Sequence, residues 1–187
     1  MIAMHRSMSS ISRALPLAFI GCWLGVGCSA SADIPEVVVT QSDVRFEATP
    51  QIPGLPDQEA EIENSFDHPK GFGLPEYFDT ELYALSAVIT GRGDMTDLSF
   101  VEGVTLTLAS RAADAPPSSV VATYERTGSA RPGRSIRLKT ASDSDVLEYW
   151  GTKSAYYDIK LWGTLPEDAW AVDVQVVFSG SVSVASD

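Results

Sequence analysis

Residues 155–180 read AYYDIKLWGTLPEDAWAVDVQVVFSG, and this stretch contains two segments in which apolar and polar side chains alternate. In the first segment the alternation is centred on Tyr157, and in the second every other residue from Trp170 onward is large and apolar. A period of two is typical of a strand with one buried and one outward face. The stretch therefore predicts two strands that bury Tyr157 and Trp170, with Tyr156 and Trp162 on the opposite face.

A four-residue loop at residues 165–168 would join these two strands as a hairpin. In that arrangement Leu161 pairs with Val172 on the buried face, and Lys160 faces Asp173 on the other face. A slip of one residue would place core side chains opposite charged ones, so the alternation predicts one register.

Shorter strand patterns precede this stretch and are separated by turn signals such as TGSARPGR at residues 127–134. Residues 81–90 are apolar on both faces, which predicts a central strand. Short strands with turns between them indicate an antiparallel β-sandwich or a related fold. We therefore expect an all-β fold, an antiparallel β-sandwich that is immunoglobulin-like or jelly-roll-like. The remaining predicted strands cover residues 37–48, 103–108, 119–126 and 135–139.

Two other segments depart from the strand pattern. Residues 49–80 hold five prolines, several glycines and a group of acids, and they predict a long loop after the first strand. Compact domains carry few loops of this length, so we expect it to contain a short helix or to serve in contacts. Residues 142–150 predict one or two helical turns.

Residues 1–32 have the three parts of a secretory signal peptide. Arg6 and Arg13 lie in a start that holds no acid, residues 14–27 form an apolar run, and small residues follow. The run is shorter than the roughly 20 apolar residues that a membrane-spanning helix needs. We therefore expect the chain to be exported.

The signal has two candidate cleavage sites. The motif Gly25-Val26-Gly27-Cys28 resembles the lipobox of bacterial lipoproteins, although that family usually has leucine where Gly25 stands. Phe19-Ile20-Gly21-Cys22 is a poorer second candidate for this motif, because it would cut the apolar run short. The resemblance implies that the Cys28 thiol takes a diacylglycerol and that Cys28 becomes the new N-terminus. The alternative is the A-x-A site at residues 30–32, where cleavage after Ala32 would release a soluble protein that starts at Asp33.

These interpretations divide the chain into a signal peptide at residues 1–27, a lipidated or flexible tether at 28–36 and one sandwich domain at 37–187. The last segment has a suitable length for a single domain with its own core. Both cysteines lie at or before position 28. The folded part is therefore expected to hold no disulfide, and its stability should be indifferent to reductant.

The chain is acidic, with 25 Asp and Glu against 13 Lys and Arg and a formal net charge of −12. Every acid lies at or after Asp33, so removal of the signal makes the remainder more acidic still. An acidic surface repels nucleic acid and anionic lipid headgroups, which argues against both as partners of the domain itself. We expect contact with the membrane through the N-terminal lipid alone.

No residue pattern indicates catalysis, a bound metal or a cofactor. His68 is the one histidine outside the signal, and the most economical interpretation places it in a polar loop. Neither a G-x-S-x-G nucleophile elbow nor a zinc-binding set of cysteines and histidines accompanies it. Asp143 and Asp145 do not match an EF-hand. Arg92-Gly93-Asp94 is the tripeptide that animal integrins read, but it lies in a turn, where glycine and aspartate are common.

The candidate ligand-binding residues are three aromatic side chains, Trp150, Tyr156 and Trp162. An outward-facing tryptophan can stack on a sugar ring or anchor a protein partner. The alternative is that a second layer covers this face. Tyr156 and Trp162 are six residues apart, which is about 20 Å along a strand, so they cannot hold one sugar ring between them.

Together these observations predict a non-enzymatic protein of a bacterial cell envelope, anchored by lipid at Cys28. It would act as a binding or structural module for an envelope protein or a glycan. Two alternatives stay open: a carbohydrate-binding module that uses exposed tryptophan and tyrosine, and a hydrolase that uses two carboxylates, for which the sequence singles out no pair. Cleavage after Ala32 would instead make the protein freely secreted or periplasmic.

Overall fold

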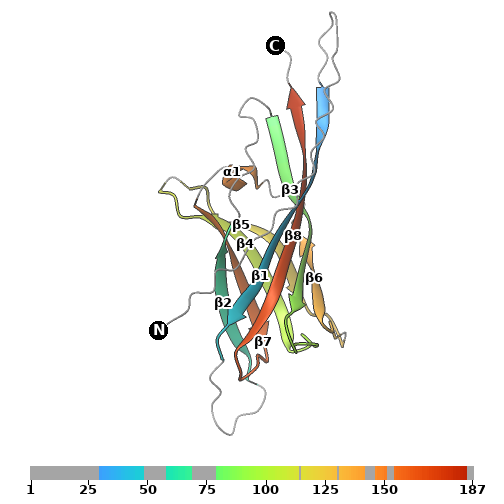
Figure 1. Cartoon of the computed structure of the whole chain (residues 1–187), viewed down its shortest axis with the longest axis vertical. Coiled ribbons are helices and arrows are strands. Elements are labelled where there is room, and N and C mark those ends of the chain that lie inside the picture. Colours follow the sequence, from blue (N-terminus) through green and yellow to red (C-terminus); the bar gives the residue numbers. More distant parts are fainter. Residues whose placement is uncertain are drawn as a thin grey trace, which may run out of the picture.

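The computed structural model describes residues 30–48, 58–68, 79–113, 115–129, 131–141, 146–150 and 154–184. Within these ranges the chain forms eight strands and one short helix (Figure 1). Among the described residues, no helix has the length and apolar character needed to cross a membrane. The elements are β1 (Ala30–Phe46), β2 (Ala60–Asp67), β3 (Asp79–Gly91), β4 (Val101–Ser110), β5 (Ser119–Glu125), β6 (Ser135–Thr140), α1 (Leu147–Trp150), β7 (Ala155–Gly163) and β8 (Trp170–Val184).

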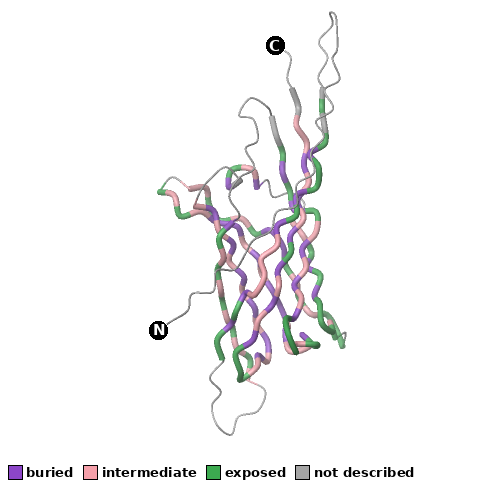
Figure 2. The backbone as a smooth tube through the Cα atoms, viewed as in Figure 1, coloured by how far each residue is buried: buried purple, intermediate pink, exposed green. Residues whose placement is uncertain are grey.

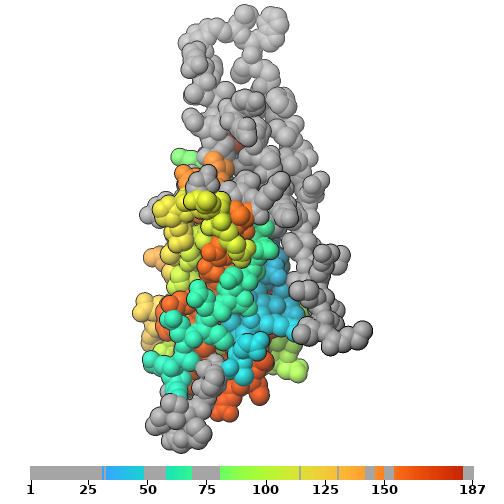
Figure 3. Space-filling view, turned by 90° about the vertical axis from the view of Figure 1, so that its left-hand side faces the viewer, coloured from blue at the N-terminus to red at the C-terminus, as the bar shows by residue number. Residues whose placement is uncertain are grey.

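The eight strands form one antiparallel sheet in the order β1-β8-β3-β6-β5-β4-β7-β2. The sheet curls strongly into a half-barrel, so that the edge strands β1 and β2 lie beside each other (Figure 1). In Figure 3 the blue surface of β1 borders the teal surface of β2. The side chain of Asn64 in β2 donates a hydrogen bond to the backbone carbonyl of Arg45 in β1. The expected all-β antiparallel fold is confirmed.

The strands make one continuous sheet in place of the two separate layers of a sandwich. β1, β8, β3 and β6 form one half, and β5, β4, β7 and β2 form the other. A short pairing of β5 with β6 joins the halves, with Ala122 opposite Thr140 and Thr123 opposite Lys139. The halves face each other across a shared core, so the interior resembles that of a sandwich although the sheet is not divided.

The two strands predicted from residues 155–180 exist, but the predicted hairpin is wrong. β7 pairs with β2 and β4, whereas β8 pairs with β1 and β3. Leu161 and Val172 both point into the core as predicted, yet Leu161 lies beside Val104 of β4 in the sheet. Residues 164–169 carry the chain across from one half to the other. Alternation determines which face of a strand is buried, and it leaves the neighbouring strand undetermined.

The core lies between the two halves and is built from the inward residues of every strand. In Figure 2 the buried purple positions alternate with pink and green ones along the strands. Tyr157 and Trp170 are both buried, which confirms their predicted positions. Trp170 stacks on Phe46 with ring centroids 4.6 Å apart and meets Phe100 edge-on at 5.0 Å. The indole Nε1 of Trp170 is buried and has no hydrogen-bond partner among the described residues.

The long loop predicted at residues 49–80 is wrong in its middle, where β2 forms. Alternate residues of β2 are half-buried against the core and the others are exposed. The inward set includes Asn64 and the outward set consists mostly of acids, so this segment has the composition of a polar loop. The other inward residues are the apolar Ala60, Ile62 and Phe66, and an edge strand, which pairs on one side only, tolerates a polar residue such as Asn64 among them. Residues 49–57 and 69–78 lie outside the described residues.

At one end of the molecule three strands extend beyond the others. They are the beginning of β1, the end of β8 and the beginning of β3 (Figure 1). Ala32 pairs with Val182, and Val182 pairs with Thr80. Gly180 permits the close approach of β8 to β3, because a Cβ at this position would collide with the carbonyl of Glu81. The helix α1 lies within the predicted helical segment at residues 142–150, of which residues 142–145 are outside the described part.

Candidate functional site

Cys28, the predicted lipidation residue, lies outside the described residues. β1 begins at Ala30, two residues later in the chain, and so overlaps the segment 28–36 that was predicted as a tether. Ala30 pairs with Val184 and Ala32 with Val182. Cleavage before Cys28 would leave the whole of β1 in the exported chain, whereas cleavage after Ala32 would remove the start of this strand.

Trp162 lies half-buried on the outer face of β7, the face that the alternation predicts. Its neighbour on β4 is Gly103. The indole ring covers this glycine, because a Cβ added at position 103 would overlap the ring. An aromatic ring laid over a strand glycine fills the space that a missing side chain leaves. Part of the Trp162 indole is therefore used for packing within the protein.

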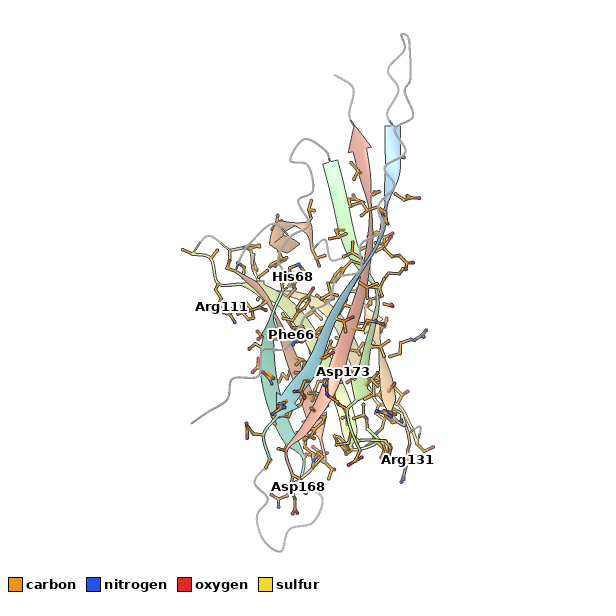
Figure 4. All side chains as sticks on the ribbon, viewed as in Figure 1. Phe66, His68, Arg111, Arg131, Asp168 and Asp173 are labelled. Atoms are coloured by element: carbon orange, nitrogen blue, oxygen red, sulfur yellow. The ribbon has the colours of Figure 1, made fainter. Side chains whose placement is uncertain are left out.

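Tyr156 lies on the same outer face and has a cationic partner. The guanidinium carbon of Arg111 lies 4.2 Å from the centroid of the Tyr156 ring. Arg111 also donates a hydrogen bond of 2.9 Å to the Oδ1 of Asp67, and this bond raises the pKa of Arg111. A guanidinium over an aromatic face is attracted by the ring's negative face. One face of Tyr156 is thus already occupied (Arg111 is labelled in Figure 4).

The surface between these two rings is polar. Lys160 lies between Tyr156 and Trp162 along β7 and forms an ion pair of 2.8 Å with Glu61 of β2. The hydrogen bond with Glu61 raises the pKa of Lys160. On the β4 side the neighbours of Lys160 and Asp158 are threonines, at positions 105 and 107. The outer face of β7 therefore presents hydroxyl groups and an ion pair between two half-exposed aromatic rings.

Trp150 is the last residue of α1, and its side chain is outside what the structure describes. The helix α1 lies at the end of the sheet where β7 begins (Figure 1). The backbone N–H of Val146, just before α1, donates to the carbonyl of Leu82 in β3. Trp162 lies near the other end of β7, so the backbone places Trp150 and Trp162 at different ends of this strand.

His68 is buried directly after β2, so its predicted place in a polar loop is wrong. Its backbone N–H donates to the carbonyl of Ala155 at 2.9 Å, and its Nδ1 lies 3.0 Å from the Oη of Tyr157. Phe66 stacks on Tyr157 with ring centroids 5.1 Å apart. Burial lowers the pKa of His68 to about 4 and raises the pKa of the fully buried Tyr157. Figure 4 labels His68 and Phe66 beside the upper part of β2, on the side of the molecule toward α1.

The structure places Ser65 and Asp67, the neighbours of His68 in the sequence, on the opposite side of β2 from the His68 ring. Ser65 and Asp67 are exposed on the outer side of β2, whereas the His68 ring is buried and contacts Tyr157. A Ser-His-Asp relay requires the histidine within hydrogen-bond reach of both partners. The described contacts therefore give His68 a role in packing the end of β2 against β7.

A cluster of ion pairs lies where β1 meets β8, and the sequence did not indicate it. Asp43 has a positive φ of 62° and sits in a bulge of β1. The Oδ1 of Asp173 accepts hydrogen bonds of 2.9 Å from the backbone N–H of Asp43 and from Arg92. Arg45 pairs with the Asp43 carboxylate at 2.8 Å. Aspartate tolerates this left-handed conformation better than most residues, and the cluster holds it there (Asp173 is labelled in Figure 4).

Arg92 of this cluster is also the first residue of the Arg92-Gly93-Asp94 tripeptide. Its guanidinium contacts Asp173 at 2.9 Å and Asp43 at 3.5 Å. Gly93 has a φ of 61°, as expected for a glycine in a tight turn. The arginine is therefore engaged by the protein's own carboxylates, which favours the turn explanation of this tripeptide.

The described residues include no group of three or more His, Cys, Asp or Glu side chains that could hold a metal ion. Asp43 and Asp173 lie close together, but Arg92 contacts an oxygen of each. A glycosidase pair leaves room for a substrate between its carboxyl groups. Asp143 and Asp145 lie outside the described residues.

Comparison with protein families and with curated proteins identifies no relative. No family model matches the chain, and no curated protein matches it. A functional assignment therefore depends on the residues of this chain alone.

Proposed function

We propose that this protein is an exported lipoprotein of a bacterial cell envelope, held at a membrane by lipid on Cys28. It acts there as a non-enzymatic binding or structural module. The observation that carries the proposal is the short distance between the lipobox-like motif and the fold, since only Ser29 separates Cys28 from the start of β1 at Ala30.

The pairing of β1 supports Cys28 over Ala32 as the end of the signal. Ala30 and Ala32 both pair with β8, so cleavage after Ala32 would take backbone hydrogen-bonding partners away from Val182 and Val184. Cleavage before Cys28 keeps these pairs. A single lipid chain anchors a protein weakly, whereas the several chains of a lipoprotein anchor it stably. The three-stranded extension would then connect the anchor to the body of the domain.

The proposed binding role rests on the outer faces of the sheet. We propose that the half-barrel is used as immunoglobulin-like and jelly-roll-like sandwiches are, with a packed core that holds surface residues in place for an envelope protein or a glycan. The half-exposed rings of Tyr156 and Trp162 and the hydroxyl groups between them support such a contact. A carbohydrate-binding module would use these same residues, one ring for each sugar contact.

Metabolic labelling with an alkyne analogue of palmitate tests the anchor directly. The full chain is expressed in a bacterial host that lipidates envelope proteins, next to the variants Cys28→Ser and Cys22→Ser. We expect wild type and Cys22→Ser to carry the label and to sediment with membranes, and Cys28→Ser to lose the label. A labelled Cys28→Ser protein, or an unlabelled wild type, would contradict the proposal.

A further inference from the structure

The outer face of β1, β8 and β3 carries most of the exposed large apolar side chains among the described residues. Val38, Tyr83 and Leu85 are 36%, 37% and 48% exposed, and all three lie on these strands. The fourth such residue, Val120, lies on β5. Val38 pairs with Val177 of β8, which is half-buried on the same outer face. Concentrated exposed apolar side chains mark interaction sites more often than scattered ones do.

A β-bulge in β3 produces the most exposed of these side chains. Ala84 pairs with Phe178 and Ser86 with Val177, so Leu85 is an extra residue in β3. Ala84 and Ala87 are both buried, and Leu85 and Ser86 between them therefore point outward together. Bulges that redirect a side chain are frequently functional features of a sheet.

Charged residues lie at two opposite ends of this face. At one end Asp33 and Glu81 both pair with Ser181, and all three side chains share one row across the strands. At the other end a row runs from Thr40 through β8 and β3 to Arg137 of β6. Asp33, Glu81 and Arg137 are exposed. The rows are six residues of β8 apart, which is about 20 Å.

Most of the apolar side chains lie between the acidic row and the basic row, and Val88 lies in the basic row itself, beside Arg137. We define the apolar face as Val38, Tyr83, Leu85, Val88 and Val177. Glu36, exposed on β1, adds a further acid toward the acidic end. An interface core depleted of charge, with a charged rim, has the usual composition of a protein–protein contact.

We infer that the apolar face binds a second copy of this chain in a two-fold symmetric dimer. A two-fold interface uses the same patch on both subunits, so the patch must be complementary to itself. The two-fold axis lies between the two packed sheets, crosses the strands and passes β8 between Val177 and Ser179. It places the acidic row of one copy over the basic row of the other. Glu81 of one copy then lies over the Arg137 side of the other, and the apolar face meets its own copy. Two packed sheets lie about 10 Å apart, within reach of these long side chains.

A lipid bilayer fits the same face less well. Asp33, Glu36 and Glu81 would approach the headgroups together with the apolar side chains, and anionic lipids repel carboxylates. The dimer goes beyond the proposed function and does not depend on a lipid at Cys28, because the apolar face consists of residues on β1, β3 and β8.

Thiol crosslinking of the full chain tests the dimer in the cell that makes it. The native cysteines are Cys22 and Cys28, so Val177→Cys places a single thiol within the folded part. Cells are treated with a short bismaleimide and the products are separated by size under denaturing conditions. Thr123→Cys is the matched control, because this residue is exposed on the outer face of β5, in the other half of the sheet.

We expect a crosslinked dimer for Val177→Cys and none for wild type or Thr123→Cys. An uncrosslinked Val177→Cys protein whose thiol still reacts with a monofunctional maleimide would overturn the inference. Equal crosslinking of Thr123→Cys would do so as well, because it would show random collision. A Val177→Cys thiol that reacts only after detergent is added would identify the bilayer as the occupant and also overturn the dimer.

A charge exchange in the Val177→Cys background tests the two-fold arrangement. Arg137→Glu should cause loss of the crosslinked band, and adding Glu81→Arg should restore it by reversing both ends of the contact. Leu85→Asp should abolish the band as well. These three side chains are exposed, so the core is untouched by the changes. A double charge variant that crosslinks no better than Arg137→Glu alone would contradict the proposed geometry.

Discussion

Acidification should destabilise this fold through the buried histidine, His68. His68 lies against Tyr157, and burial lowers its pKa from 6.5 to about 4. The unfolded chain therefore takes up the proton more readily than the folded chain. The stability associated with a neutral His68 is fully present above about pH 6.5, falls as the pH drops through the window between the two pKa values, and is lost below about pH 4.

The size of this effect follows from the two pKa values. One pKa unit corresponds to about 1.4 kcal/mol, so the complete loss is about 3 kcal/mol. Between about pH 8 and about pH 5 the proton linkage of His68 alone should remove about 2 kcal/mol from the free energy of unfolding. Tyr157, the titratable group that contacts the ring, has its pKa raised by burial and stays neutral over this range.

Urea unfolding followed by tryptophan fluorescence measures this free energy at each pH. The variant His68→Gln cannot take up the proton, and its amide can still hydrogen-bond to the Tyr157 hydroxyl. Carboxylates titrate alike in both proteins, so the difference between the two curves isolates His68. We expect wild type to lose about 2 kcal/mol more than His68→Gln over that range. Parallel pH profiles for the two proteins would refute the burial argument.

Four further predictions concern packing and redox behaviour. Gly103→Ala should displace the Trp162 indole, lower the free energy of unfolding by about 1–3 kcal/mol and shift the fluorescence emission to the red; unchanged emission would show that the ring does not cover the glycine. Gly180→Ala should lower the melting temperature because its Cβ would meet the Glu81 carbonyl, and an unaltered melting curve would contradict this close approach. Trp170→Ala should lower the free energy of unfolding by roughly 3–5 kcal/mol, and Trp170→Phe should lower it far less, because the phenylalanine keeps a ring and removes a buried N–H that has no partner among the described residues. Equal losses of unfolding free energy for the two variants, measured by urea unfolding, would contradict this. Melting curves with and without dithiothreitol should coincide, because no cysteine follows position 28, and a shift would reveal an unexpected thiol contact.

Strand faces could be predicted from the sequence, and strand neighbours could not. The alternation around Tyr157 and Trp170 identifies the buried side of β7 and β8 because burial on one face imposes a period of two. Nothing in that period distinguishes a hairpin from a crossing between facing halves of a curled sheet. The choice depends on β1 and β3 for β8, and on β2 and β4 for β7, which lie far away in the chain.

The same distinction applies to the candidate site: the face on which a side chain lies could be predicted from the sequence, and its contact partners could not. The outward position of Tyr156 and Trp162 follows from local alternation, and the structure places both on that face. Their partners, Arg111 and Gly103, come from the end of β4 and from its interior, and local pattern gives no sign of either contact. β2 was missed because prolines and acids dominate residues 49–80 and mask the alternation of Ile62 and Phe66 with acidic neighbours, and the burial of His68 was missed with it.

The anchor at Cys28 is the central claim, and the intact mass of the protein purified from its own envelope tests it most directly. Fragmentation of the N-terminal peptide from the same sample identifies the first residue. We predict a chain that starts at Cys28 and carries two or three acyl chains, with every residue of β1 retained. An unmodified chain that starts at Asp33 would contradict the account, and would make the protein a free secreted domain whose first strand is shortened.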